Sequence, residues 1–193
     1  MRSVRPPGPS LLLEERRRLR ELRRQTWLAR ERAVALWMHG AAAWPPVEFA
    51  LLSVSWLGDG KAWYALIATL PWWGGPTGLM CAVYMVALGA VNLVFYRALK
   101  HWFARPRPYV SCPGIRACGR SLDEFSFPSG HTMHAVAFSL VLAHYHPALA
   151  APLWAFTLLV ALSRVVLGLH YPSDVAVGAA IGWVMAMFML VIV

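Results

Sequence analysis

Long apolar segments recur along this chain, and they constrain its fold more than any other feature. Leu79–Leu99 and Val175–Val193 are long enough to cross a hydrocarbon core of about 30 Å as helices that rise about 1.5 Å per residue. The whole chain is 59% hydrophobic and only 14% charged, which is far too apolar for an ordinary soluble domain. We therefore predict that a membrane is its solvent.

Turn-forming residues divide the remaining apolar sequence into shorter segments. Breaks fall at Gly74-Gly75-Pro76, at His146-Pro147 and at Tyr171-Pro172. The pattern predicts an all-α fold, namely a multi-pass transmembrane helix bundle of five or six spans. The other predicted spans are Trp63–Trp73, Thr132–His144 and Leu153–Leu169, and Ala41–Leu57 forms either a short crossing or an interfacial helix that ends at Gly58-Asp59-Gly60.

The positive charge of the chain belongs mainly to its N-terminal end. The formal charge is +9, and ten of the eighteen basic residues are Arg between Arg2 and Arg32, so no nucleic-acid partner is expected. Leu11–His39 predicts a basic amphipathic helix whose Arg side chains meet anionic head groups, with a solvated or partner-binding helix as the alternative. We expect a basic N-terminal region over residues 1–40 and a membrane-embedded domain over residues 41–193.

Ionisable residues gather at the borders of the predicted spans, where their cost makes them candidates for function. Counting crossings places Lys100, His131 and His170 on the same membrane face. A helix bundle would gather the cations, histidines and carboxylate of this face around one cavity. Such a set suits a phosphate group, which needs cations to neutralise it and an imidazole to attack it or to protonate its ester oxygen. The candidates are Lys100, Arg105, Arg107, Ser129, His131, Arg164, His170 and Asp174.

Two local patterns support a phosphate site. Pro128-Ser129-Gly130 opens a predicted helix, and the free N–H groups and positive dipole end of a helix N-terminus bind anions. Asp174 lies four residues after His170, so we expect its carboxylate to accept a hydrogen bond from one imidazole nitrogen and to leave the other as a nucleophile.

Three motifs stand in order along the chain. They are Lys100 with Arg107-Pro108, then Pro128-Ser129-Gly130-His131, and then Ser163-Arg164 with His170 and Asp174. In this order and spacing, K-x6-RP, PSGH and SR-x5-H-x3-D, the chain resembles the type 2 phosphatidic acid phosphatase family. The motifs cover Lys100–Asp174, and the arrangement of spans extends the resemblance over residues 58–193.

The resemblance implies a role for each motif residue. His170 would be the nucleophile that forms a phosphohistidine, Asp174 the carboxylate that orients it, and His131 the general acid that protonates the leaving oxygen. Arg105 lies outside the family spacing and should matter less than Arg107. Neither a metal nor a cofactor is expected, because cations stabilise the charge of the phosphoryl group. The implied substrate-binding residues are Lys100, Arg107, Ser129, Gly130 and Arg164.

These inferences predict an integral-membrane phosphatase that hydrolyses the phosphomonoester or diphosphate of a lipid. The candidate substrates are undecaprenyl diphosphate, phosphatidylglycerophosphate and phosphatidic acid. A lipid phosphotransferase that uses the same phosphohistidine is the alternative among enzymes, and a catalytically idle membrane scaffold is the alternative outside them. The oligomeric state stays open.

The expected orientation depends on residues 41–57. If this segment crosses the membrane, the Arg-rich end is cytoplasmic and the active site faces the periplasm or the outside; if it does not cross, the positive-inside bias places the site in the cytoplasm. We expect the cell (inner) membrane and an outward site, where the resemblance implies that many relatives act. An outward site would also permit a disulfide between Cys112 and Cys118, and the three cysteines fit no zinc pattern.

Overall fold

The computed structural model describes residues 9–121 and 123–192, and every regular element in this part of the chain is a helix. The predicted all-α fold is confirmed. The long helices are α1 (Pro9–His39), α2 (Pro45–Trp56), α3 (Ala62–Trp73), α4 (Gly78–Phe103), α6 (Gly130–Tyr145), α7 (Ala150–Val166) and α8 (Pro172–Ile192). The short elements are α5 (Pro108–Ser111), η1 (Gly40–Ala43), η2 (Leu57–Lys61), η3 (Gly75–Thr77) and η4 (Pro147–Leu149).

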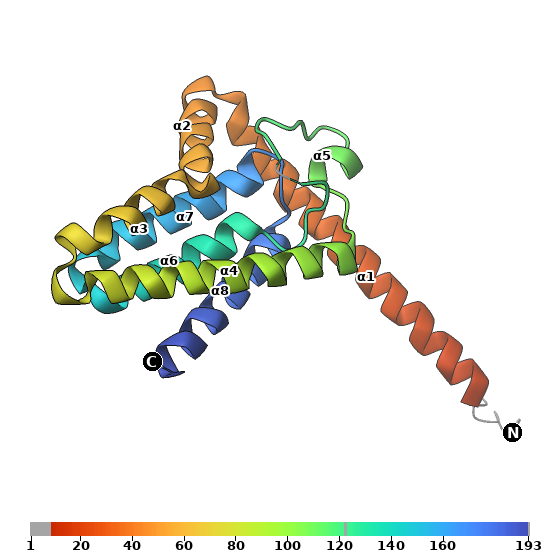
Figure 1. The fold of residues 1–193 in the computed structure, drawn as a ribbon. Coiled ribbons are helices and arrows are strands. Elements are labelled where there is room, and N and C mark those ends of the chain that lie inside the picture. Colours follow the sequence, from red (N-terminus) through yellow and green to blue (C-terminus); the bar gives the residue numbers. More distant parts are fainter. Residues whose placement is uncertain (1–8, 122, 193) are drawn as a thin grey trace, which may run out of the picture.

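Helix α6 is the centre of the bundle. It packs against α4, α7 and α8 (Figure 1), and most of its side chains are buried. The ring of Trp63 from α3 meets Phe138 of α6 and Phe156 of α7, with ring centroids 5.4 and 5.6 Å apart. A helix with apolar residues all around it is suited to such a surrounded position.

Small residues bring α8 close to α6. Gly178, Gly182 and Ala186 recur at every fourth position of α8, and all three are buried. A Cβ atom at Gly178 would lie 2.5 Å from the carbonyl oxygen of Ser129, and one at Gly182 would clash with the carbonyl oxygen of Met133. This spacing of small residues lets two transmembrane helices pack backbone against backbone.

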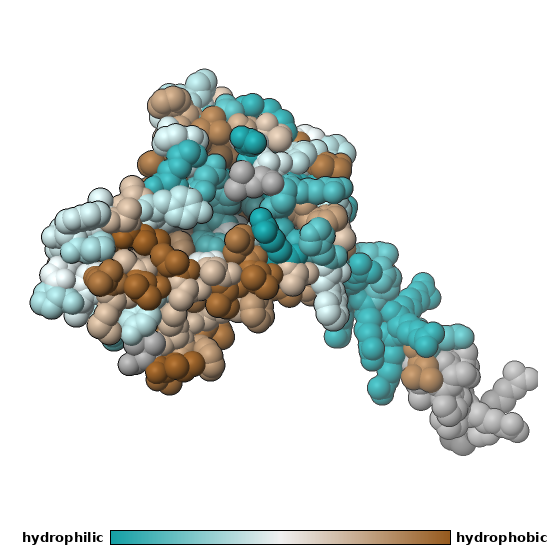
Figure 2. Space-filling model, in the orientation of Figure 1, coloured by the Kyte–Doolittle hydropathy of each residue, from teal (hydrophilic) through white to brown (hydrophobic). Residues whose placement is uncertain are grey.

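The outside of the bundle is apolar. The segments Gly75–Ser111, Pro147–Val166 and Pro172–Ile192 are each long and apolar enough to cross a membrane. Figure 2 shows hydrophobic surface over the bundle and hydrophilic surface over the projecting α1. The exposed apolar side chains include Leu79, Val83, Val86 and Val94 of α4, Leu158, Leu159 and Leu162 of α7, and Val184, Phe188 and Val191 of α8.

The bundle has two distinct ends. At one end, Trp73 packs on His146 with ring centroids 5.5 Å apart, so the turns after α3 and after α6 lie together. At the other end, the N–H of Ser129 at the start of α6 donates to the carbonyl oxygen of Asp174 at the start of α8, at 2.9 Å. All three sequence motifs lie at this second end, as the count of crossings predicts.

The C-terminal part of α1 also lies at the motif end. His39 is buried, and its Nδ1 donates to the carbonyl oxygen of Val166 at 2.8 Å. The backbone N–H of Arg116, in the loop after α5, donates to the other ring nitrogen of His39 at 3.2 Å. The N-terminal part of α1 projects away from the bundle (Figure 1).

Helix α2 does not connect the two ends. At its start, Glu48 accepts a bond of 2.8 Å from Arg116, and at its end the hydroxyl of Ser55 accepts a bond from Arg164. Both partners belong to the motif end. Within residues 41–57 the structure therefore shows a short helix, α2, both ends of which contact residues of the motif end.

We predict that Gly182→Ala destabilises the protein, because the new methyl group meets the backbone of α6. Overpacking of this kind costs about 1–3 kcal/mol, and the melting temperature of the purified protein in detergent measures it. Gly40→Ala is the matched control, since a Cβ atom there meets nothing within 4 Å. Equal melting temperatures for the two variants would contradict this close packing of α6 and α8.

Candidate active site

His170 lies in the loop between α7 and α8 and is almost fully buried. The span predicted over Leu153–Leu169 ends early, at Val166, because Gly168 turns the chain with φ of 74°. A side chain at Gly168 would also clash with the backbone of Arg116. The early end of α7 frees the following residues to form the loop that carries the imidazole.

Two neighbours determine which ring nitrogen of His170 carries the proton. Its Nδ1 lies 2.6 Å from the carbonyl oxygen of Ser126, which only accepts, so Nδ1 carries the proton. Its Nε2 lies 3.3 Å from the Arg107 guanidinium, which only donates. Burial, followed by the charges of Arg164 and Arg107, lowers the pKa of His170 well below its ordinary value. The imidazole is therefore neutral, with the Nε2 lone pair available as a nucleophile.

Three buried cations lie near His170. Lys100, Arg107 and Arg164 come from α4, the segment after it and α7, and each is at most 4% exposed. All three line one cavity of about 430 Å³ together with His170 and His131. The grouping predicted from the sequence is present, and it gives the cavity a strongly electropositive end.

One carboxylate forms ion pairs with two of these cations. One oxygen of Asp123 lies 2.6 Å from Lys100 Nζ and 2.7 Å from an Arg107 nitrogen. Burial raises the pKa of Asp123, but the hydrogen bonds and charges of Lys100 and Arg107 outweigh it and lower that pKa below its ordinary value. An ionised carboxylate thus sits where a phosphoryl oxygen would bind these two cations.

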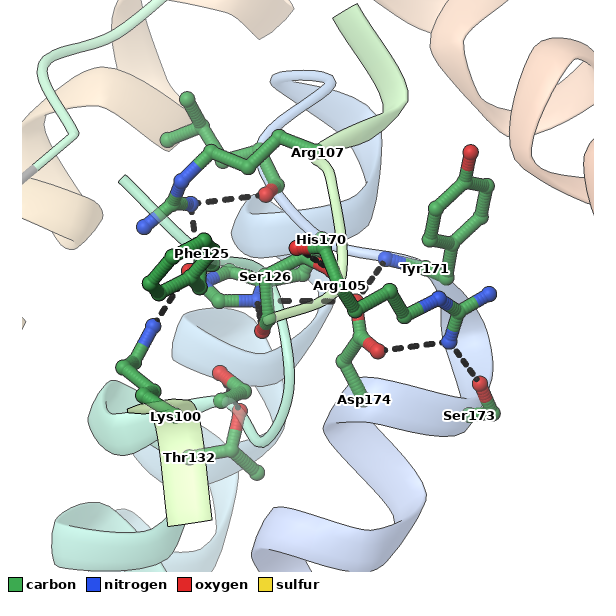
Figure 3. Close-up of polar contacts among 12 residues, drawn as sticks. Lys100, Arg105, Arg107, Phe125, Ser126, Thr132, His170, Tyr171, Ser173 and Asp174 are labelled. Atoms are coloured by element: carbon green, nitrogen blue, oxygen red, sulfur yellow. Dashed lines mark hydrogen bonds and ion pairs between the residues drawn. The ribbon is translucent and has the colours of Figure 1, made fainter. Parts of the chain in front are cut away.

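Asp174 does not make the predicted hydrogen bond to His170. The nearest oxygen of Asp174 is 3.8 Å from Nδ1, which donates to Ser126 instead (Figure 3). That oxygen accepts the backbone N–H of Tyr171 at 2.7 Å, and the other accepts a guanidinium nitrogen of Arg105 at 2.7 Å. Asp174 therefore holds the backbone of Tyr171, next to His170, and ties this part of the chain to Arg105.

Arg105 faces away from the cations of the cavity. Besides Asp174, its guanidinium binds the Ser173 hydroxyl at 2.8 Å and Glu31 of α1 at 2.7 Å. The N-terminal helix is thereby linked to the carboxylate beside His170 through one arginine. This placement agrees with the family spacing, which selects Arg107 for the phosphate site.

The start of α6 supplies the remaining motif residues. Gly130 and His131 line the cavity. Ser129 is buried, its hydroxyl lies 3.0 Å from that of Thr132, and it is not among the residues that line the cavity. His131 Nε2 pairs with a carboxylate oxygen of Asp59, which lies in η2.

Sequence reasoning missed several residues of the site. Asp123, Phe125 and Ser126 belong to a polar loop whose carboxylate and carbonyl oxygens hold Lys100, Arg107 and His170. Backbone carbonyls leave no signal in a sequence. Asp59 does leave one, since it is an isolated acid between two apolar helices, the kind of residue that marks a function in a membrane.

The cavity continues from its polar end into an apolar groove. The groove lies along α3, α4 and α6, and its walls carry Tyr64, Ile67, Met85, Val86, Leu93 and Phe138. One molecule that fits both parts would carry an anionic group on an apolar chain. Cys112 and Cys118, which border this end of the bundle, are free thiols.

Comparison with known proteins identifies a family and several relatives that this chain resembles. The PAP2 superfamily model matches residues 78–193. The undecaprenyl-diphosphatase BcrC of Bacillus subtilis (strain 168) is 33% identical over 113 residues, which cover 58% of this chain and 58% of that protein. The putative undecaprenyl-diphosphatase YbjG of Escherichia coli (strain K12) is 32% identical over 126 residues, 62% of this chain and 61% of that protein. The chain thus matches about three fifths of the length of these two relatives.

A solved structure shares the fold. The crystal structure of Aquifex aeolicus LpxE matches with a TM-score of 0.72 at 24% identity, over 82% of this chain and 93% of that chain. Because this match covers more of the chain than residues 78–193, it includes part of the chain before α4.

We predict that Asp123→Asn strengthens the binding of inorganic phosphate, because it removes the charge that competes for Lys100 and Arg107. A gain of about 10-fold, or about 1.4 kcal/mol, is expected in isothermal titration of the purified protein. Glu124→Gln is the matched control, since it removes a carboxylate from the exposed neighbouring position. Unchanged or weaker binding by Asp123→Asn would contradict a carboxylate in the phosphate position.

Proposed function

Because this chain belongs to the PAP2 superfamily, as its three motifs predict, we propose that it is an integral-membrane phosphatase acting on the phosphomonoester or diphosphate of a lipid. The observation that carries the proposal is the two-part cavity, which has buried cations and two histidines at one end and an apolar groove at the other. The cations match a phosphate, and the groove matches an acyl or prenyl chain.

The substrate proposed first is a polyprenyl diphosphate such as undecaprenyl diphosphate. The two curated relatives are named as undecaprenyl-diphosphatases, which supports this choice. Phosphatidylglycerophosphate and phosphatidic acid carry the same combination of phosphate and apolar chain, so they belong in the same assay.

The proposed mechanism begins with attack on phosphorus by Nε2 of His170. Nδ1–H stays bonded to the Ser126 carbonyl during the attack, which keeps the ring aimed at the cavity. Lys100, Arg107 and Arg164 bind the phosphoryl oxygens and stabilise the charge that spreads over them in the transition state.

A proton from His131 goes to the leaving oxygen as the P–O bond breaks, and a phosphohistidine remains. His131, now neutral, then takes a proton from water as the water attacks phosphorus and releases inorganic phosphate. Asp174 serves as a positioning residue, because its carboxylate accepts the backbone N–H of Tyr171, the residue after His170, and the guanidinium of Arg105. We propose that the reaction needs no metal ion, since the cations supply the charge.

The test is phosphate release by the detergent-purified protein from a panel of lipid phosphates and diphosphates in the presence of EDTA. We expect wild type to be active and His170→Ala to lose about 1,000-fold or more. His144→Ala, a histidine exposed at the far end of α6, is the control that should retain activity. Activity that survives His170→Ala, or that EDTA abolishes, would contradict the phosphohistidine mechanism or the metal independence respectively.

We also propose that the active site faces the cytoplasm, the opposite of the orientation expected from the sequence. The contacts of Glu31 and His39 place the C-terminal part of α1 at the active-site end. The turns at the far end, residues 74–77 and 146–149, contain no Lys or Arg. The Arg-rich segment before Arg32 therefore adjoins the catalytic face, and the positive-inside bias assigns that face to the cytoplasm.

The contacts of Glu31 and His39 also bear on where the N-terminal region lies. The exposed part of α1 carries Arg on several sides together with Leu19, Leu22 and Trp27. We propose that this part of residues 1–40 lies against anionic head groups of the leaflet that borders the active site.

Cysteine labelling tests the orientation. In a variant with Cys118→Ser, the two remaining cysteines, Cys81 and Cys112, are buried. One exposed cysteine is then added, either at Thr77→Cys in the far turn or at Arg120→Cys in the loop of the active-site end. In intact bacterial cells, an impermeant maleimide should label Thr77→Cys, and it should label Arg120→Cys only after lysis. The reverse pattern would establish an outward active site.

A further inference from the structure

Asp59 is placed where it can act on the proposed acid, His131. One of its carboxylate oxygens pairs with Nε2 of His131, and its side chain is 18% exposed at the wall of the catalytic cavity. Asp59 belongs to none of the three motifs, and it lies outside the residues 78–193 that the family model matches. The motifs leave it without a role.

The backbone on both sides of Asp59 places its carboxylate beside His131. Between α2 and α3, η2 interrupts the helical path, and Gly60 has φ of 114°, a conformation that residues with a side chain rarely adopt. Gly58 lies against α7 and α6, because a Cβ atom there would lie 3.1 Å from Val160 and 3.8 Å from His131. Gly58 thus permits the close approach of η2 to α7, Gly60 permits the bend of the backbone, and Asp59 between them pairs with His131.

Other charges near this pair do not replace Asp59. Asp123 is bonded to Lys100 and Arg107, and Asp174 is bonded to Arg105 on the outer side of the His170 loop. Of the acidic side chains that line the cavity, Asp59 and Asp123, only Asp59 pairs with His131 in the part of the chain that the structure describes. Burial and then the charge of the nearby Arg164 disfavour a cationic His131, and the hydrogen bond and charge of Asp59 act against both.

We propose that Asp59 is a positioning residue that holds His131 in its protonated form and fixes the plane of its ring for proton transfer to the leaving oxygen. This inference rests on the proposed function and adds to it a residue from the turn between α2 and α3. The pairing of a carboxylate with one ring nitrogen, while the other nitrogen does the chemistry, is a common way to set the state of a catalytic histidine.

The proposed step balances without any further reactant. The imidazolium of His131 carries two N–H protons, of which one stays in the bond with Asp59. The other passes to the leaving oxygen while the P–O bond breaks and the bond from His170 Nε2 to phosphorus forms. His131 becomes neutral, and it regains a proton from the water that later hydrolyses the phosphohistidine.

Leaving-group dependence distinguishes this role from a structural one. An alkyl lipid phosphate has a basic leaving oxygen that needs protonation, whereas p-nitrophenyl phosphate releases a stable phenolate that hardly needs it. We expect Asp59→Asn to lower kcat/KM for the alkyl phosphate by about 10- to 100-fold and for p-nitrophenyl phosphate by less than about 3-fold. His131→Gln should show the same selective pattern, and Asp59→Glu should restore part of the lost activity.

Glu48→Gln is the matched control, because it removes another ion-paired carboxylate, that of α2 with Arg116, away from the cavity. Glu48→Gln should leave kcat/KM for both substrates unchanged. A loss of equal size for both substrates in Asp59→Asn, at an unchanged melting temperature, would overturn the proposal, as would full activity of that variant on the alkyl phosphate. Failure of wild type to hydrolyse either substrate would instead count against the proposed function itself.

Discussion

The burial of three cations in one place is the constraint on which the rest of this structure depends. Lys100, Arg107 and Arg164 are each at most 4% exposed, and an unpaired buried charge costs several kcal/mol. The fold therefore has to bring acceptors to them. Asp123 and the carbonyl oxygen of Phe125 hold Lys100, Asp123 and the carbonyl oxygen of Leu169 hold Arg107, and Ser55 holds Arg164.

The helices position the cations, and the loops supply most of the acceptors. The close packing of α8 on α6 through Gly178 and Gly182 fixes the backbone at the start of both helices. The loop before α6 is then tied to the segment after α4, since the N–H of Ser126 donates to the carbonyl oxygen of Arg105 at 2.8 Å. A rigid bundle thus carries the cations, while an irregular loop that is buried in protein supplies the oxygens. Irregular backbone near a membrane is tolerated only in such a protected place.

Several features were predictable because they repeat or because they are costly. The apolar segments predict α3, α4, α6 and α8 to within a few residues, since a membrane demands long apolar helices. The cations and histidines of the motifs stand out because ionisable residues are rare in such a chain. By contrast, the bond from His170 to Asp174 is not formed. The four-residue spacing predicts it for a helix that begins near Pro172, and α8 does begin there, but Nδ1 of His170 donates to the carbonyl oxygen of Ser126 and the oxygens of Asp174 accept from Tyr171 and Arg105.

The sequence alone determined the solvent, the helical class, the motif end of the bundle and the identity of its cations and histidines. These follow from composition and from the parity of helix crossings, which need no coordinates. Only the tertiary structure decided which acceptor meets each of these groups: Asp123 on Lys100 and Arg107, Ser126 on His170, Asp59 on His131, and Glu31 of α1 on Arg105. These partners lie 16 to 74 residues apart along the chain. Their meeting depends on the paths of loops and bends, which a membrane does not prescribe and which no local pattern of residues encodes.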